Sequence, residues 1–254
     1  MVSQSKIPVI NPMVAGSDVL HRVRTWPNAS WVETELQQLA GSLKERDTIA
    51  EVGIGAGSYA RSLSLPGAVR VTLDLPVQSS QPYAPWPLAD DSVDLLLTVD
   101  SLNYESDVES FVREAARVTR TTKLFACVAR SRDDLQSDGV ATFFPEAVER
   151  ILPLVTETAV LEKMLEQHGL YCMTRRSLAG HLQIDEALLR AIAHRELTGL
   201  ATLTEEEFAK GVAAITASVS SGDATWPSSF TMLVCRKVRP WKSGSTLAPE
   251  MGKM

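Results

Sequence analysis

The chain has 254 residues, of which 44% are hydrophobic and 22% are charged, a balance typical of a globular protein that can bury a core. Its formal net charge of −6 at pH 7 disfavours a nucleic-acid partner, because phosphate binding requires a dense surface of Lys and Arg. The start of the chain has no signal-peptide pattern and no apolar run reaches the roughly 18 residues of a membrane span, so we expect a cytoplasmic protein without a membrane partner.

The cysteine and histidine patterns do not indicate a metal site. Each of the three cysteines, Cys127, Cys172 and Cys235, stands in an apolar stretch, and none has the C-x-x-C spacing of zinc or redox motifs. The histidines His21, His168 and His181 show no metal-ligand spacing either. We therefore expect reduced thiols in the core.

The first part of the chain is predicted to form an arm and cap helices, over residues 1–44. Residues 1–16 contain two prolines and no periodic pattern, which is typical of an irregular arm. Helices are expected at 17–25 and 29–44. In the second, apolar residues recur at helical spacing: Trp31, Val32, Leu36, Leu39 and Leu43.

Short buried strands alternate with helices along the rest of the chain. We expect strands at 48–53, 68–75, 93–99, 123–130, 170–178 and 228–238. We expect helices from 58 to about 65 and at 107–120, 156–169, 184–198 and 203–218, with loops at 76–92 and 131–155. This alternation predicts an α/β fold, in which a mostly parallel sheet is covered on both faces. Ligands of such sheets bind at the carboxyl ends of the strands.

A glycine-rich turn, Glu51-Val52-Gly53-Ile54-Gly55-Ala56-Gly57, follows the first strand. Glycines there allow the backbone to approach a ligand closely. The G-x-G-x-G spacing followed by Ser58 fits a dinucleotide fingerprint poorly. Glu51 would also repel a pyrophosphate. The turn therefore favours a ligand that has an ammonium group and no phosphate.

Asp74 ends the second strand of this unit. A carboxylate at that position can accept hydrogen bonds from both hydroxyls of a ribose. The alternative is that Asp74 only caps a turn before Pro76.

Three blocks of the sequence, EVGIGAGSYA, VTLDL and PWPLADDSVDLLLTVDSLNYESDVESFVREAARVTR, together resemble the class I S-adenosylmethionine-dependent methyltransferases. The resemblance is to the small-molecule type that includes ubiquinone- and menaquinone-biosynthesis-like enzymes, and it covers roughly residues 20–237. It implies a Rossmann-like three-layer sandwich with an antiparallel last strand and a helical cap. The implied core spans residues 45–237, with a helical insertion at about 177–227 and a disordered tail at 238–254.

The resemblance also implies roles for individual residues. Those that would bind S-adenosylmethionine are Glu51, Gly53, Ile54, Gly55, Gly57, Asp74, Val99 and Asp100. Among these, Asp74 would hold the ribose diol, and Val99 and Asp100 would lie beside the sulfonium. Asn103 and Tyr104 would face a small-molecule acceptor.

The sequence departs from the family pattern between Asp74 and Asp94. Family members usually have a further helix and strand there, so we expect a truncated sheet edge. The acidic residue that often meets the adenine amine is not evident either. Gln81 or Tyr83 can substitute for it, and Trp86 can stack on adenine.

Methyl transfer from a sulfonium requires alignment, and it requires a base only where the nucleophile carries a proton of high pKa. Tyr104 and His194 are the candidates for such a base, although Tyr104 can equally pack and His194 fits a surface position on a helix. The predicted function is methyl transfer to a small organic molecule. The alternatives are a methyltransferase-fold enzyme that catalyses a cyclisation or rearrangement, and a non-catalytic partner subunit.

Overall fold

The computed structural model describes residues 29–53, 56–75, 85–102, 105, 107–197 and 199–238. The helix predicted at 17–25 and the tail after Val238 lie outside these residues. Within the described part of the chain, no helix is long and apolar enough to span a membrane.

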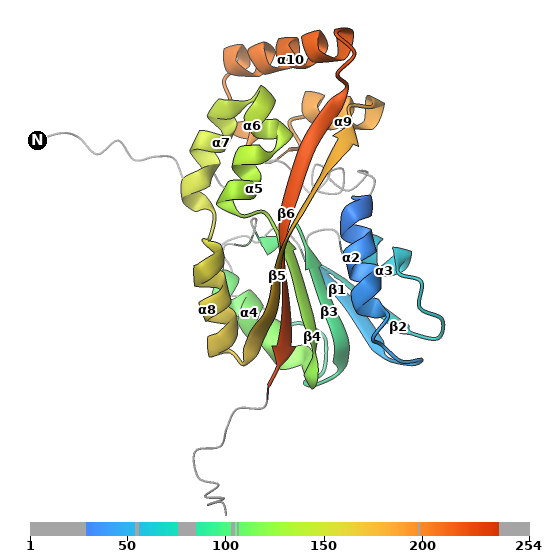
Figure 1. Cartoon of the computed structure of the whole chain (residues 1–254). Coiled ribbons are helices and arrows are strands. Elements are labelled where there is room, and N and C mark those ends of the chain that lie inside the picture. The colour runs from blue at the N-terminus through green and yellow to red at the C-terminus, as the bar shows by residue number, and fades with distance from the viewer. Residues whose placement is uncertain are drawn as a thin grey trace, which may run out of the picture.

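One sheet of six strands forms the centre of the described structure (Figure 1). The strands are β1 (Thr48–Gly53), β2 (Val69–Asp74), β3 (Val93–Val99), β4 (Thr119–Ala129), β5 (Leu170–Gln183) and β6 (Thr225–Lys237). Their order is β2-β1-β3-β4-β6-β5, and β6 alone runs antiparallel to its neighbours. The predicted mostly parallel sheet with an antiparallel last strand is therefore confirmed. In the described residues β2 lies at one edge of the sheet with no further strand beyond it, as expected from the short segment after Asp74.

The helices of the described residues lie on both faces of the sheet and beyond one end of it. They are α2 (Ser30–Ala40), α3 (Ser58–Ser62), α4 (Val108–Val118), α5 (Arg132–Ser137), α6 (Gly139–Phe143), α7 (Pro145–Ile151), α8 (Thr158–Gln167), α9 (Glu186–Ala193) and α10 (Glu205–Ser220). Short 3₁₀ turns follow at Leu152–Leu154 and Leu200–Thr202.

Two hydrophobic cores hold the helices on the sheet. On one face α4 and α8 pack against the strands, with Phe111 and Leu165 fully buried. On the other face α2 and α3 pack, with Val32 and Leu36 fully buried. Because both faces are covered, β3 is almost continuously buried and its side chains alternate between the two cores. Of the segment 1–44, which was predicted to form an arm and cap helices, the described helix α2 lies against one face of the sheet.

A helical lobe, made of α5, α6, α7, α9 and α10, lies beyond the carboxyl end of β4 (Figure 1). It is carried by β5 and β6, which remain paired from Ser177–Thr231 to Gln183–Thr225, past the last β4 pair at Ala129–Thr231. The lobe has its own core around Phe144 and Trp226.

The lobe differs from the sequence prediction in two respects. The segment 131–155, predicted to be a loop, forms α5, α6 and α7, because local caps start each helix. The Ser131 hydroxyl accepts from Asp134 N, the Asp138 carboxylate accepts from Val140 N, and Pro145 opens α7. The helical insertion is also shorter than 177–227, since β5 and β6 extend into both ends of that range.

Gly211 fixes how α10 packs in the lobe. A Cβ at this position would lie 2.2 Å from the Phe144 ring and 2.6 Å from the Phe143 carbonyl oxygen. We expect Gly211→Ala to lower the free energy of unfolding by about 1–3 kcal/mol, because the overlap outweighs alanine's helix propensity. Urea unfolding measures the change.

Gly41→Ala is the matched control for this substitution. Gly41 has a φ of −60°, and the nearest atom to its Cβ would be 3.3 Å away. Gly41→Ala should change the free energy of unfolding by no more than about 1 kcal/mol. Equal stabilities of the two variants would contradict the packing assigned to α10.

Candidate functional site

The glycine turn lies at the carboxyl end of β1. Gly53 and Gly57 have φ angles of +145° and +118°, which L side chains rarely adopt. A Cβ on Gly53 would lie 2.2 Å from the Ser101 Oγ, and one on Gly57 would lie 2.8 Å from the Thr72 Cγ2. The protein's own packing therefore requires both glycines, whereas the sequence analysis attributed them to a ligand alone. Ile54 and Gly55 lie outside the described residues.

Glu51 joins β1 to the helix that follows the turn. Its side chain is buried, and its Oε2 accepts a hydrogen bond of 2.7 Å from Ala60 N in the first turn of α3. A carboxylate there satisfies an unpaired helical N–H group and interacts favourably with the helix dipole. Glu51 thus holds the start of α3 against the strand.

Asp74 is the last residue of β2 and is exposed. It pairs in register with Gly53, and Leu75 N donates to Gly53 O at 3.0 Å. The carboxylate of Asp74 and the glycine turn therefore lie side by side at the carboxyl ends of neighbouring parallel strands, as the sequence predicts.

Val99 and Asp100 end β3, the strand on the other side of β1. Asp100 has a φ of +49°, and such strain in a residue other than glycine is concentrated at functional sites. Its carboxylate lies 3.3 Å from the Arg130 Nε. Burial raises the pKa of Asp100, and the Arg130 charge opposes that rise.

Arg130 and Asp138 form an ion pair that sequence analysis missed. The Arg130 Nη1 lies 2.8 Å from the Asp138 Oδ2, and the Asp138 side chain is fully buried. Asp138 also accepts hydrogen bonds from Ser228 Oγ at 3.1 Å and from Val140 N at 2.9 Å. The pair connects the end of β4 to the helical lobe. The sequence feature that could have indicated this ion pair is Asp138, an acidic residue directly before a short helix.

Ser101 is a second residue that sequence analysis missed. It is buried directly after β3, and its hydroxyl donates to Val99 O at 3.0 Å. The same oxygen occupies the space over Gly53 described above. Ser101 therefore fixes the distance between the ends of β1 and β3.

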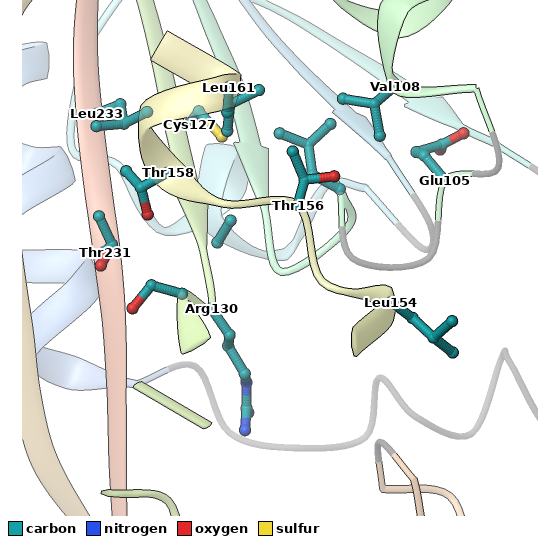
Figure 2. A pocket seen from close by; sticks show the side chains of 13 residues that line it. Glu105, Val108, Cys127, Arg130, Leu154, Thr156, Thr158, Leu161, Thr231 and Leu233 are labelled. Atoms are coloured by element: carbon teal, nitrogen blue, oxygen red, sulfur yellow. The ribbon is translucent and has the colours of Figure 1, made fainter. Parts of the chain in front are cut away.

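A pocket opens at the carboxyl end of β4, between α4, α8 and β6 (Figure 2). Leu161, Leu233 and Cys127 form its apolar wall, and Thr158 and Thr231 add hydroxyls. Figure 2 shows Glu105 and Val108 at one end, with Arg130 directed away from Glu105. The sequence does not single out Glu105, because nothing in the residues beside it predicts burial.

Glu105 is a buried carboxylate without a hydrogen-bond partner in the described part of the chain. Both of its carboxylate oxygens are inaccessible to solvent. Burial, and secondly the negative charge of Asp107, raise the pKa of Glu105 to about 7.

The structure separates two predicted residues from the strand ends. Trp86 does not lie over a nucleotide crevice: it is 3% exposed and packs edge-on against Phe111, with ring centroids 5.0 Å apart. The expected adenine stacking is therefore wrong. His194 follows α9 in the lobe and is exposed, as the surface alternative expected. Asn103 and Tyr104 lie outside the described residues, as do Gln81 and Tyr83.

The described residues contain no group of three or more His, Cys, Asp or Glu side chains that could hold a metal ion. Cys127 and Cys235 are buried, and burial raises the pKa of the Cys127 thiol. Cys172 is half-buried, with its Sγ 2.8 Å from the Cys235 Sγ across β5 and β6.

The Glu105 carboxyl makes stability depend on pH. Between its ordinary pKa of about 4.3 and its folded pKa of about 7, the unfolded chain loses a proton that the folded chain keeps. The carboxyl therefore destabilises the folded state progressively as pH rises through this window. We expect Glu105→Gln to raise the free energy of unfolding by about 1–3 kcal/mol at pH 8 and by almost nothing at pH 4.

Urea unfolding at the two pH values measures this difference. Glu109→Gln, at an exposed position near the start of α4, is the control and should show no such dependence. An equal gain from Glu105→Gln at both pH values would mean that the carboxyl is not buried as described.

Comparisons with protein-family models and with curated protein sequences found no match. Solved structures do match. A candidate methyltransferase from an antibiotic biosynthesis pathway of Anabaena variabilis has a TM-score of 0.59 at 16% identity, over 85% of this chain and 99% of that one. A candidate methyltransferase from Bacillus halodurans has a TM-score of 0.54 at 13% identity, over 82% and 99%. The YcgJ protein from Bacillus subtilis has a TM-score of 0.52 at 15% identity, over 83% and 100%. At these identities the likeness concerns the architecture, and the chain has the Rossmann-like fold of methyltransferases.

Proposed function

We propose that this chain binds S-adenosylmethionine at the carboxyl ends of β1, β2 and β3 and transfers its methyl group to a small organic molecule. The observation that carries the proposal is the juxtaposition of Gly53 and Asp74 on paired parallel strands. In sheets of this kind the crevice at the strand ends is the ligand site. The fold shared with the candidate methyltransferases supports the same position.

The residues at these strand ends fit the chemistry of the cofactor. Asp74 presents an exposed carboxylate, the group that accepts two hydrogen bonds from a ribose diol. Asp100, beside the end of β1, and Asp74 are both acidic, which suits a ligand with a sulfonium and an ammonium and disfavours a pyrophosphate. The Thr98 hydroxyl is buried there and has no partner among the described residues.

The cofactor, when bound, supplies an electrophilic methyl group on a positively charged sulfur. Asp74 would hold the ribose, and Asp100 would lie beside the positive charge. Glu51 acts indirectly, because its carboxylate is bonded to the start of α3 and so holds the glycine turn in place. Ser101 keeps the ends of β1 and β3 at a fixed separation.

The helical lobe completes the site. Arg130 and Ser131, at the junction of β4 with the lobe, line the pocket described above, and so does Leu154 after α7. Side chains from the sheet and from the lobe would together form the pocket for the acceptor. Alignment of the acceptor supplies much of what an in-line displacement needs.

Calorimetric titration with S-adenosylmethionine tests the binding step. We expect the protein to bind it and not to bind NAD. Asp74→Ala should weaken binding at least tenfold, which corresponds to the loss of charge-assisted hydrogen bonds. Glu51→Gln should also weaken binding, because the loss of the carboxylate that accepts from Ala60 N displaces the glycine turn.

Asp133→Ala, at an exposed position on α5, is the control and should bind as the wild type does. Unchanged affinity in both the Asp74 and the Glu51 variants would refute the assigned site. Product analysis with a donor labelled in the methyl group then distinguishes methyl transfer from the alternatives raised by the sequence. Label in the organic product supports transfer, and a changed product without label indicates cyclisation or rearrangement.

A further inference from the structure

Two cysteine side chains meet between the neighbouring strands β5 and β6. Cys172 and Cys235 are direct partners in the antiparallel register, and the register shifts between Cys172 and Thr174, just beyond this pair. Both side chains lie on the α4 and α8 face of the sheet, where Cys235 belongs to the core and Cys172 packs against it. Their Sγ atoms are in contact at 2.8 Å, and both residues are free cysteines. The pairing of β5 with β6 therefore brings together two thiols that are distant in the sequence.

The register of this pair fits a disulfide, and the position of the third cysteine does not. Residues directly opposite in antiparallel strands have Cα atoms about 4.5–5.5 Å apart, within the range of about 4.4–6.8 Å that a disulfide spans. Cys127 of β4 pairs instead with Leu233, two residues from Cys235 along β6. Such diagonal neighbours lie about 7–8 Å apart, which is too far for a bond unless the backbone moves. Cys172 is thus the cysteine within bonding reach of Cys235.

The two thiols of the pair differ in exposure and acidity. Cys172 is half-buried, whereas Cys235 is fully buried. The hydrogen bond with the Cys235 thiol lowers the pKa of Cys172, and the same contact, together with burial, raises the pKa of Cys235. The thiolate is the nucleophile in thiol chemistry, so Cys172 is the side chain suited to attack an external reagent. Cys235 is then placed to react with the sulfur of Cys172.

We propose that Cys172 and Cys235 form a reversible disulfide by exchange with a small organic disulfide. The Cys172 sulfur attacks one sulfur of the reagent, and the other sulfur leaves as a thiol that takes up the Cys172 proton. The Cys235 sulfur then attacks the Cys172 sulfur, and the second thiol leaves with the Cys235 proton. Two electrons thus pass from the cysteine pair to the reagent, which is reduced to two thiols. The inference goes beyond the proposed function, since it concerns a covalent modification and not methyl transfer.

The bond would join β5 to β6 near the ends of these strands that lie away from the helical lobe (Figure 1). The two cysteines are 63 positions apart in the sequence, and α9 and α10 lie between them. A crosslink that closes so long a loop restricts the unfolded chain more than the folded one. We therefore expect the oxidised chain to be more stable than the reduced chain.

Treatment of the full chain with bis(2-hydroxyethyl) disulfide tests the proposal. This reagent is uncharged, so the negative charges of Glu162 and Glu166 near Cys172 do not repel it. The thiol count measured in denaturant should fall from the three free cysteines to one, and non-reducing peptide mapping should find Cys172 bonded to Cys235. The midpoint of urea unfolding should rise by roughly 1 M. Dithiothreitol should restore both the thiol count and the midpoint.

Two variants check the assignment of the bond. Cys172→Ser should keep both of its remaining thiols, because the buried Cys235 and Cys127 lack a partner within reach. Cys127→Ala, the matched control, should lose both of its remaining thiols. Circular dichroism checks that each variant is folded, and the mapping of the wild type is decisive even where one is not.

Four results for the wild type would overturn the proposal. They are an unchanged thiol count, a lasting adduct of the reagent on Cys172, a bond that includes Cys127 or a second chain, and an oxidised chain that unfolds at no higher urea concentration than the reduced one. None of these results would bear on S-adenosylmethionine binding, which is measured separately with the reduced protein.

Discussion

The ion pair between Arg130 and Asp138 links the sheet to the helical lobe. Arg130 follows β4, where the parallel sheet ends, and Asp138 starts a helix of the lobe. The pair is buried, so removal of either partner would leave an uncompensated charge at a cost of about 3–5 kcal/mol. Because Arg130 also contacts Asp100, the end of β3 is held by the same guanidinium. A single guanidinium thus joins the ends of β3 and β4 to the lobe that β5 and β6 carry.

Several residues that the sequence assigned to ligand binding also make contacts that the folded protein itself requires. Glu51 caps α3, and the two described glycines of the turn make room for Ser101 and Thr72. A close backbone turn thus needs the same residue types whether the neighbour is a ligand or the chain itself. Asp74 is exposed at the sheet edge, whereas Glu51 is buried, so replacing Asp74 disturbs the packing less than replacing Glu51 does.

The sequence predicts this sheet well and the lobe less well, for a physical reason. β1 and β3 have the predicted bounds, because strands buried on both faces appear as unbroken apolar runs. The helices α5 to α7 are too short to show a period and depend on caps such as Ser131 and Asp138. Of the candidate site, the strand ends were predictable, because parallel strands bring them together. The burial of Glu105 was not, because the segments around it, from α4 to β6, are far apart in the chain.

Two carboxylates at the same end of the sheet experience opposite environments. Asp74 is exposed to solvent at the edge of the sheet. Both oxygens of Glu105 are buried without a hydrogen-bond partner among the described residues, and burial raises the pKa of this carboxyl to about 7. Burial, and not position along the strands, therefore decides how readily a carboxyl group at this end of the sheet carries a charge.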